Sequence, residues 1–337
     1  MILGGAGLSW ADGGALTSGN VTVGMADWGV IPIPCGGAGQ PACFANYDCD
    51  CDGVPDGATC RGTSHIGVYI SPTGDGLDPG NPDEAWGIQV DRAQGLGKPV
   101  ARGWVTAIDT GGPSATNLTL NSFTKTSDVL TSTTSVTNRS YISVVHELIE
   151  SPEASGTLFQ LAVTITNTDT TTHRIEYRRT IDWDAVPSAF DEAITITGWP
   201  QTNLLNWSDD GFNDGNMSIA LLDFQTCGTG ADFTDCGTSP SDHGMGFDFD
   251  CGVIDAGATV TFVFFYGAAT TEALAVTALS NANAAVTGFA QNHCDANGQN
   301  LGTPATFIFG IRNDTGNICQ ATPSVPEEGA WGWTHRH

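Results

Sequence analysis

Hydrophobic and polar residues alternate along much of the chain with the two-residue period of a β-strand. Between residues 157 and 167, Phe159, Leu161, Val163 and Ile165 are apolar, whereas the positions between them are small or polar. Successive side chains of a strand point to opposite faces, so this segment predicts a strand with one face on a hydrophobic core. Similar patterns occur at 20–25, 65–70, 101–108, 117–125, 141–148, 173–184, 193–198, 217–224, 259–266 and 305–312.

Clusters of Gly, Asn, Asp and Pro separate these segments. Many strands with short turns predict an all-β fold of antiparallel sheets, either a β-sandwich or an enlarged supersandwich. One helix is expected near 271–291, an alanine-rich segment that carries Leu274, Ala278 and Leu279 on one stripe and should cover a sheet edge. We expect residues 1–320 to form a single large unit and residues 321–337 an extended tail.

Composition and charge limit the kinds of molecule that the protein can bind. The 337 residues include 11 basic and 37 acidic ones, which gives a formal charge of -26. Nucleic acids are bound by clustered cations, so a nucleic-acid partner is excluded. No segment approaches the roughly 20 apolar residues of a membrane span. With 40% hydrophobic residues the chain has ample material for a core.

A run of alternating aspartates within the Cys- and Asp-rich stretch 35–60 carries the sharpest chemical signal. Aspartates stand at positions 1, 3, 5 and 9 of the run, with a glycine at position 6. Alternation places carboxylates on one side of a loop, and hard oxygen ligands favour calcium. The alternative is an acidic surface turn held by disulfides. The run resembles the calcium loops of thrombospondin type 3 repeats. The predicted calcium ligands are Asp48, Asp50, Asp52, the carbonyl of Val54, and Asp56.

Ten cysteines without a thiol-redox motif point to an oxidising compartment and therefore to an exported protein. Their spacing differs from the paired Cys of zinc sites, which favours disulfides. The candidates form two groups of five, so at least one bridge joins the groups or joins subunits, or two thiols stay free. The groups are Cys35, Cys43, Cys49, Cys51 and Cys60, and Cys227, Cys236, Cys251, Cys294 and Cys319, of which Cys227 and Cys236 are placed to close a local loop.

A second acidic constellation begins in the segment 173–184. Two of its aspartates share a strand face with Arg178, and a further pair follows downstream. Paired carboxylates can hold a metal or act as acid and base in glycoside hydrolysis. The alternative is a structural role, in which they pair with Arg178 and Arg179 and cap turns. The four residues are Asp182, Asp184, Asp209 and Asp210.

Glycan chemistry has two further signals in the sequence. Tryptophan rings can stack on sugars, although burial in the core is the alternative for each of them. The candidate platforms are Trp86, Trp104, Trp183 and Trp207. N-x-S/T sequons permit glycosylation at Asn20, Asn117, Asn138, Asn206, Asn216 and Asn313. No nucleophile elbow, P-loop or dinucleotide fingerprint occurs, and we expect the protein not to be an enzyme.

Several short segments between Trp86 and Gly310 form an ordered series. They are 164–168, 177–184, 208–212, 242–244, 247–249, 265–268 and 302–310, and the stretch 324–329 begins like a sorting signal. This series resembles a group of bacterial exported proteins, many of which end in a PEP-CTERM sorting tail. The resemblance implies secretion and association with the cell surface or the extracellular matrix, without a particular reaction.

The sequence therefore favours a secreted structural protein of a surface layer, matrix or extracellular filament, stabilised by calcium and disulfides. We expect it to associate with itself into a homopolymer or layer, and extracellular polysaccharide is a further expected partner. The alternative function is a glycan-binding or glycan-processing β-sandwich protein.

Overall fold

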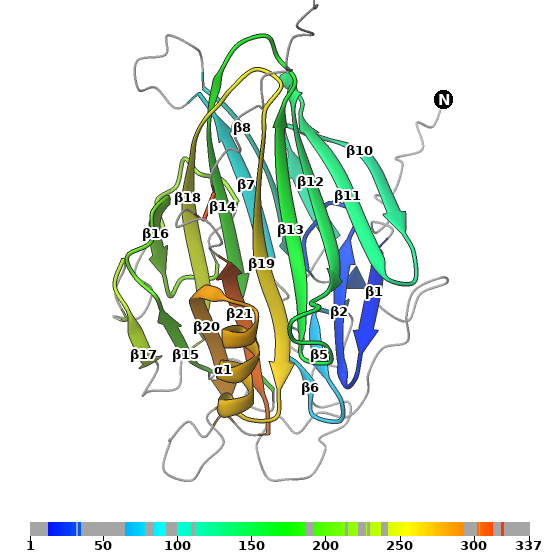
Figure 1. Ribbon diagram of the computed structural model, residues 1–337, viewed down its shortest axis with the longest axis vertical. Helices are drawn as coiled ribbons and strands as arrows, with labels where there is room; N and C mark the ends of the chain where they lie inside the picture. The colour runs from blue at the N-terminus through cyan, green and yellow to red at the C-terminus, as the bar shows by residue number, and fades with distance from the viewer. Residues whose placement is uncertain are drawn as a thin grey trace, which may run out of the picture.

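The computed structural model describes residues 13–31, 33–34, 65–77, 84–91, 100–108, 112–186, 192–212, 215–221, 227, 230–236, 242–292, 302, 304–312 and 318–319. Two large antiparallel sheets pack face to face within this part of the chain (Figure 1). The predicted all-β sandwich is confirmed. The expected tail, 321–337, lies outside the described residues.

The larger sheet has nine strands. In spatial order they are β10 (Leu118–Lys125), β11 (Val129–Val136), β12 (Arg139–Glu150), β13 (Leu158–Asn167), β19 (Thr259–Ala269), β21 (Thr306–Arg312), β20 (Ala284–Asn292), β15 (Glu192–Thr197) and β17 (Phe233–Cys236).

The second large sheet has six strands, and smaller sheets of four and two strands accompany the pair. The six are β16 (Leu204–Ser208), β18 (Gly244–Ile254), β14 (His173–Asp182), β7 (Glu84–Val90), β8 (Ala101–Ile108) and β9 (Gly112–Thr116). The four are β1 (Gly13–Ser18), β2 (Val21–Ala26), β5 (Val68–Ile70) and β6 (Gly74–Asp75), and β3 (Ile33–Pro34) pairs with β4 (His65–Ile66).

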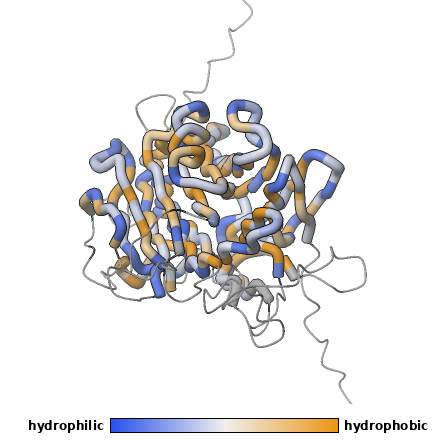
Figure 2. The backbone as a smooth tube through the Cα atoms, turned by 90° about the horizontal axis from the view of Figure 1, so that it is seen from below, coloured by the Kyte–Doolittle hydropathy of each residue, from blue (hydrophilic) through white to orange (hydrophobic). Residues whose placement is uncertain are grey.

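The alternating pattern of β13 decides which of its faces meets the core. Phe159, Leu161, Val163 and Ile165 are buried, and the residues between them are half-buried on the other face. Figure 2 shows the same alternation of hydrophobic and hydrophilic positions along neighbouring strands. Aromatic rings fill the space between the sheets. Tyr177 on β14, for example, lies 5.1 Å from the ring of Phe262 on β19.

Strand β14 is buried on both faces, unlike the half-exposed strand that its pattern suggests. Its inner face meets the core, and on the other side Arg178 donates a hydrogen bond to the carbonyl of Asn216. The segment 215–218 lies close against this sheet. A Cβ on Gly87 would stand 1.8 Å from the carbonyl oxygen of Gly215, so the close approach requires glycine at 87.

The helix expected near 271–291 exists but is shorter. Helix α1 runs from Glu272 to Asn281, with the Thr271 side chain accepting the N–H of Leu274 at its start. Asn283 has a left-handed φ of 55°, and the remaining residues form β20. Ala275, Ala278 and Leu279 are buried against the nine-stranded sheet, whereas Leu274 is exposed. Helix α1 therefore covers a sheet face rather than a sheet edge.

The two-residue pattern does not predict strand β11, because hydroxyl groups occupy its inner positions. In β11, Ser132 and Thr134 are buried, and they donate to the carbonyls of Asp27 and Val144. Strands β7 and β18 were missed as well. Conversely, the strand expected at 217–224 is wrong for its described part, where the chain turns and Ile219 N–H donates to the carbonyl of Asn216.

Two disulfides tie the described chain together. Cys227 pairs with Cys236, which confirms the local loop, and Cys251 on β18 pairs with Cys319. The four described cysteines have no free thiol among them. Among the described helical residues, α1 included, there is no stretch long and apolar enough to cross a bilayer.

Candidate functional site

Several candidate residues fall on segments that the structure does not describe. The calcium ligands Asp48, Asp50, Asp52, Val54 and Asp56 lie outside the described residues. So do Cys35, Cys43, Cys49, Cys51, Cys60, Cys294 and the sequon residue Asn313. The calcium site and the pairing of these cysteines stay predictions.

The four aspartates of the second acidic constellation are all buried, and two of their segments meet. A Cβ on Gly211 would lie 2.8 Å from the Cα of Asp182, and Gly244 N–H donates to the carbonyl of Asp209. Asp210 accepts the N–H of Phe212 in a turn. Asp184 N–H donates to the carbonyl of Gly76. A metal or catalytic role for these carboxylates stays a prediction.

The two arginines of β14 do not pair with these aspartates as the structural alternative expects. They pair with Asp248 and Glu84 instead. Arg178 forms two hydrogen bonds with Asp248, at 2.7 and 2.8 Å. Arg179 lies inside the sandwich and pairs with Glu84, with 2.5 Å between Nη2 and Oε1. Sequence reasoning missed Glu84 because its partner lies 95 residues away.

The Arg179–Glu84 pair belongs to a buried polar network in the core. Tyr266 donates to Glu84 at 2.5 Å, and Arg179 also donates to the carbonyl of Gly29. Burial raises the pKa of the Glu84 carboxyl even though Arg179 and its hydrogen bonds oppose that shift. Burial likewise raises the pKa of Tyr266. His146 lies 3.0 Å from the hydroxyl of Tyr177, and burial holds the pKa of His146 well below its usual range.

One group of side chains could hold a soft metal if its disulfide were reduced. Potential ligand atoms of Cys227, Cys236 and His243 lie within 4.8 Å of one another. His243 is fully buried, and its Nδ1 lies 3.6 Å from a carboxylate oxygen of Asp209. Two thiolates and an imidazole form a zinc-type ligand set, and a carboxylate behind the histidine is the usual support. As a disulfide, the two sulfurs serve as a covalent brace instead.

Of the four tryptophans considered as sugar platforms, three are fully buried. Trp86, Trp183 and Trp207 are 0% exposed and belong to the core, so a stacking role for them is wrong. Trp104 on β8 is half-buried and lines a groove of about 730 Å³. Arg102, Arg139 and the sequon residues Asn117, Asn138 and Asn216 line the same groove. Among the other sequon residues, Asn20 is exposed and Asn206 is half-buried.

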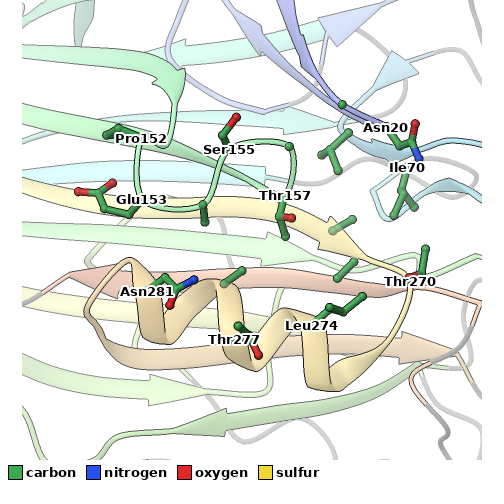
Figure 3. A pocket seen from close by; sticks show the side chains of 17 residues that line it. Asn20, Ile70, Pro152, Glu153, Ser155, Thr157, Thr270, Leu274, Thr277 and Asn281 are labelled. Atoms are coloured by element: carbon green, nitrogen blue, oxygen red, sulfur yellow. The ribbon is translucent and has the colours of Figure 1, made fainter.

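A second groove of about 680 Å³ lies between α1, the loop 152–157 and the turn between β1 and β2 (Figure 3). Its lining includes small and apolar residues, with Leu274 and Thr277 from α1 on one side. Its carboxylate, Glu153, is paired with Arg312. Glu153 is the one charged residue of this lining, and its other polar side chains are the amides and hydroxyls of Asn20, Ser155, Thr157, Thr270, Thr277 and Asn281.

The outward side of β11, β12, β13 and β19 is a nearly uncharged surface, which we call the hydroxyl face. Thr164 and Thr261 stand opposite each other with hydroxyls 3.0 Å apart, and Thr166 and Thr259 repeat this pair at 3.1 Å. In Figure 1, α1 lies over the lower parts of β20 and β21, beside the lower end of β19, and no described element lies in front of the upper halves of β11–β13. The hydroxyl face comprises Thr131, Thr133, Ser143, Val145, Glu147, Ala162, Thr164, Thr166, Thr259, Thr261 and Val263.

No protein-family model matches the chain, and no curated protein resembles it closely enough in sequence to count as a relative.

Proposed function

We propose that the protein is a secreted structural subunit whose copies associate through the hydroxyl face. The observation that carries this proposal is the distribution of charge. The chain has 11 basic and 37 acidic residues, yet Glu147 is the one charged residue among those that make up the hydroxyl face. The occupant that we assign to this face is a second copy of the chain.

Electrostatics favour this face over the rest of the surface. Copies with a formal charge of -26 repel one another, and association needs a contact where few carboxylates are brought together. Rows of Thr, Val and Ala side chains on a sheet offer methyl groups and hydroxyls that already pair across strands. Desolvating such a surface costs less than desolvating charges.

Edge-to-edge strand addition is hindered at one edge of each large sheet. Strand β9 lies at one edge of the six-stranded sheet and contains Pro113, which has no N–H to donate. Strand β10 lies at one edge of the nine-stranded sheet, and its pairing shifts register between Leu120 and Ser122. Prolines and bulges are features that hinder pairing with another chain.

Secretion and calcium binding are part of the proposal and rest on separate support. Disulfides persist in oxidising compartments, and all four described cysteines are bridged. The calcium assignment rests on the spacing of the aspartates alone. Calcium ions bound to that loop would reduce the net negative charge and so favour association.

The test is to measure the assembly state of the native chain under non-reducing conditions. Sedimentation velocity and negative-stain imaging would each be carried out once with calcium and once with EDTA. Thr133→Glu with Thr261→Glu places two carboxylates about 14 Å apart on the hydroxyl face, too far apart to disturb each other strongly. We expect this variant to lose assembly and the wild type to assemble better with calcium.

Ser114→Glu with Thr202→Glu is the matched control, because both residues are exposed and lie away from the hydroxyl face, on β9 and in the turn before β16 of the six-stranded sheet. It adds the same charge and should assemble like the wild type. A wild type that stays monomeric at every concentration would refute self-association. Equal loss in both double variants would refute the assignment to the hydroxyl face.

Glycan binding is the second candidate function, and one observation favours it. The groove beside Trp104 combines an aromatic ring, two arginines and several amides on one surface.

A further inference from the structure

The groove beside Trp104 is built from four separate parts of the chain. Strand β8 supplies Arg102 and Trp104, the link between β9 and β10 supplies Asn117, the start of β12 supplies Arg139, and the segment 215–218 supplies Asn216. Its volume of about 730 Å³ is in the range of small-molecule sites. Both large sheets contribute, so the sandwich holds the lining in place.

Arg102 is held differently from the arginines that neutralise the protein's own carboxylates. Arg174, Arg178, Arg179 and Arg312 each form an ion pair. Within the described part of the chain, Arg102 has no carboxylate within ion-pair distance, and its Nε donates to the neutral amide of Gln89 at 2.5 Å. That contact orients the guanidinium and leaves the N–H groups of its two terminal nitrogens available to another acceptor.

Gln89 is itself fixed in position. Its amide nitrogen donates to Glu176 on β14 at 2.8 Å, and the side chain of Gln89 is almost fully buried. The Glu176–Gln89–Arg102 chain therefore crosses three neighbouring strands. A guanidinium held in this way loses little side-chain entropy when a ligand binds, and its planar fork matches a carboxylate.

Trp104 gives the groove a flat aromatic wall. A Cβ on Gly215 would lie 2.9 Å from the Cβ of Trp104, so the segment that begins at Gly215 packs directly beside it. Arg178 donates to the carbonyl of Asn216 and anchors that segment to β14. Aromatic side chains combine a large apolar surface with fixed geometry, which suits the C–H faces of a sugar ring.

We propose that this groove binds an acidic oligosaccharide, with Arg102 receiving a sugar carboxylate and Trp104 stacking on a sugar ring. Arg139 adds a second positive charge, and the amides of Asn117, Asn138 and Asn216 offer donors and acceptors for hydroxyls. Two arginines in one groove are notable for a chain with 11 basic residues. The inference is independent of self-association through the hydroxyl face.

The first test measures binding of trigalacturonic acid to the full chain by calorimetry. The protein is made without N-glycosylation and its intact mass is verified, because glycans on Asn117, Asn138 or Asn216 would fill the groove. We expect saturable binding, and at least about tenfold weaker binding of neutral maltotriose, which corresponds to ~1.4 kcal/mol.

Single-residue variants test whether the sugar binds in this groove. Arg102→Gln should weaken trigalacturonate binding by about tenfold or more and leave maltotriose unchanged. Trp104→Ala should weaken both, and Trp104→Phe, which keeps a ring if the alanine variant misfolds, should retain most of the affinity. Lys125→Gln removes an exposed charge outside the groove and should bind within about twofold of the wild type.

The inference would be overturned by the absence of saturable binding up to about 10 mM, by equal affinity for the neutral sugar, or by full affinity in Arg102→Gln. Inorganic phosphate that binds as tightly as trigalacturonate would show a simple anion site, which also overturns it. Arg102→Gln should sediment like the wild type, and Thr133→Glu with Thr261→Glu should keep sugar binding. The two proposals can therefore fail separately.

Discussion

Arg179 and Glu84 form an ion pair in which both side chains are completely excluded from solvent, with 2.5 Å between Nη2 and Oε1. The two residues lie on the neighbouring strands β14 and β7. Tyr266 reaches the same carboxylate from the opposite sheet. The pair therefore links the two layers of the sandwich at its centre, and its energetics differ from those of the exposed ion pairs.

Breaking this pair should be among the most destabilising single changes in the core. Glu84→Gln leaves the Arg179 charge buried without its carboxylate, and we expect a loss of about 3–5 kcal/mol in the free energy of unfolding. The double variant Glu84→Gln with Arg179→Met should lose much less than the sum of the two single losses. Urea denaturation of all four proteins measures this coupling.

The pair of Arg312 with Glu153 provides the comparison, because both side chains are partly exposed. Glu153→Gln should cost less than about 1 kcal/mol. Additive losses at Glu84 and Arg179 would show that the buried charges do not depend on each other.

His146 should make the protein less stable in mild acid. Its folded pKa lies well below the usual value because it is buried, and nearby Arg179 lowers it further. The unfolded chain takes up a proton near pH 6.5, while the folded chain does not, so stability is fully present above that pH and falls as pH drops below it. The expected slope is about 1.4 kcal/mol per pH unit.

His146→Gln removes this titration and offers a polar group to the Tyr177 hydroxyl. We expect the variant to be less stable at pH 8 but to show a shallower loss of stability between about pH 6.5 and 5. Urea midpoints across this range measure the difference. Identical slopes in wild type and variant would exclude His146 as the source.

The two described disulfides should contribute unequally. Cys251 and Cys319 are 68 residues apart, whereas Cys227 and Cys236 are 9 apart. A longer closed loop restricts the unfolded chain more, which predicts stabilisation of about 4 kcal/mol for the first bridge and ~2.5 kcal/mol for the second. Replacing each pair by alanines and measuring urea unfolding without reductant tests this order. A larger loss at Cys227 and Cys236 would contradict it.

Calcium should raise the melting temperature if the aspartate run binds it, because a ligand that binds the folded state stabilises that state. Asp50→Ala with Asp52→Ala should remove most of that rise in scanning calorimetry. Asp128→Ala with Asp255→Ala takes away the same number of charges at exposed positions and should keep it. A rise that survives in the Asp50 and Asp52 variant would refute the assignment.

Local sequence determines much of the strand content. The two-residue period of β13 places Phe159 and Leu161 on one face whatever the partner strands are, because successive side chains of an extended chain point to opposite sides. Ala101–Ile108 was recognised with its observed bounds for the same reason. The cysteine spacing likewise pointed to the loop between Cys227 and Cys236.

Where the local helix and strand preferences of a segment are similar, the tertiary structure decides which of the two the segment forms. The segment after Asn281 is alanine-rich and could continue the helix, but as β20 it pairs with β15 and β21 in the nine-stranded sheet. Strand β11 carries hydroxyls toward the core, so its sequence lacks the apolar alternation, and pairing with β10 and β12 provides the missing signal. Pairing between distant segments outweighs weak intrinsic propensities.

The candidate sites show the same division. The sequence alone supplies Trp104 as a possible platform and the hydroxyl-rich strands, because these are properties of single segments. It does not choose among the four tryptophans, and it does not pair Arg179 with Glu84 or orient Arg102 through Gln89. Those relationships depend on which strands become neighbours, and the packing of the whole chain decides that.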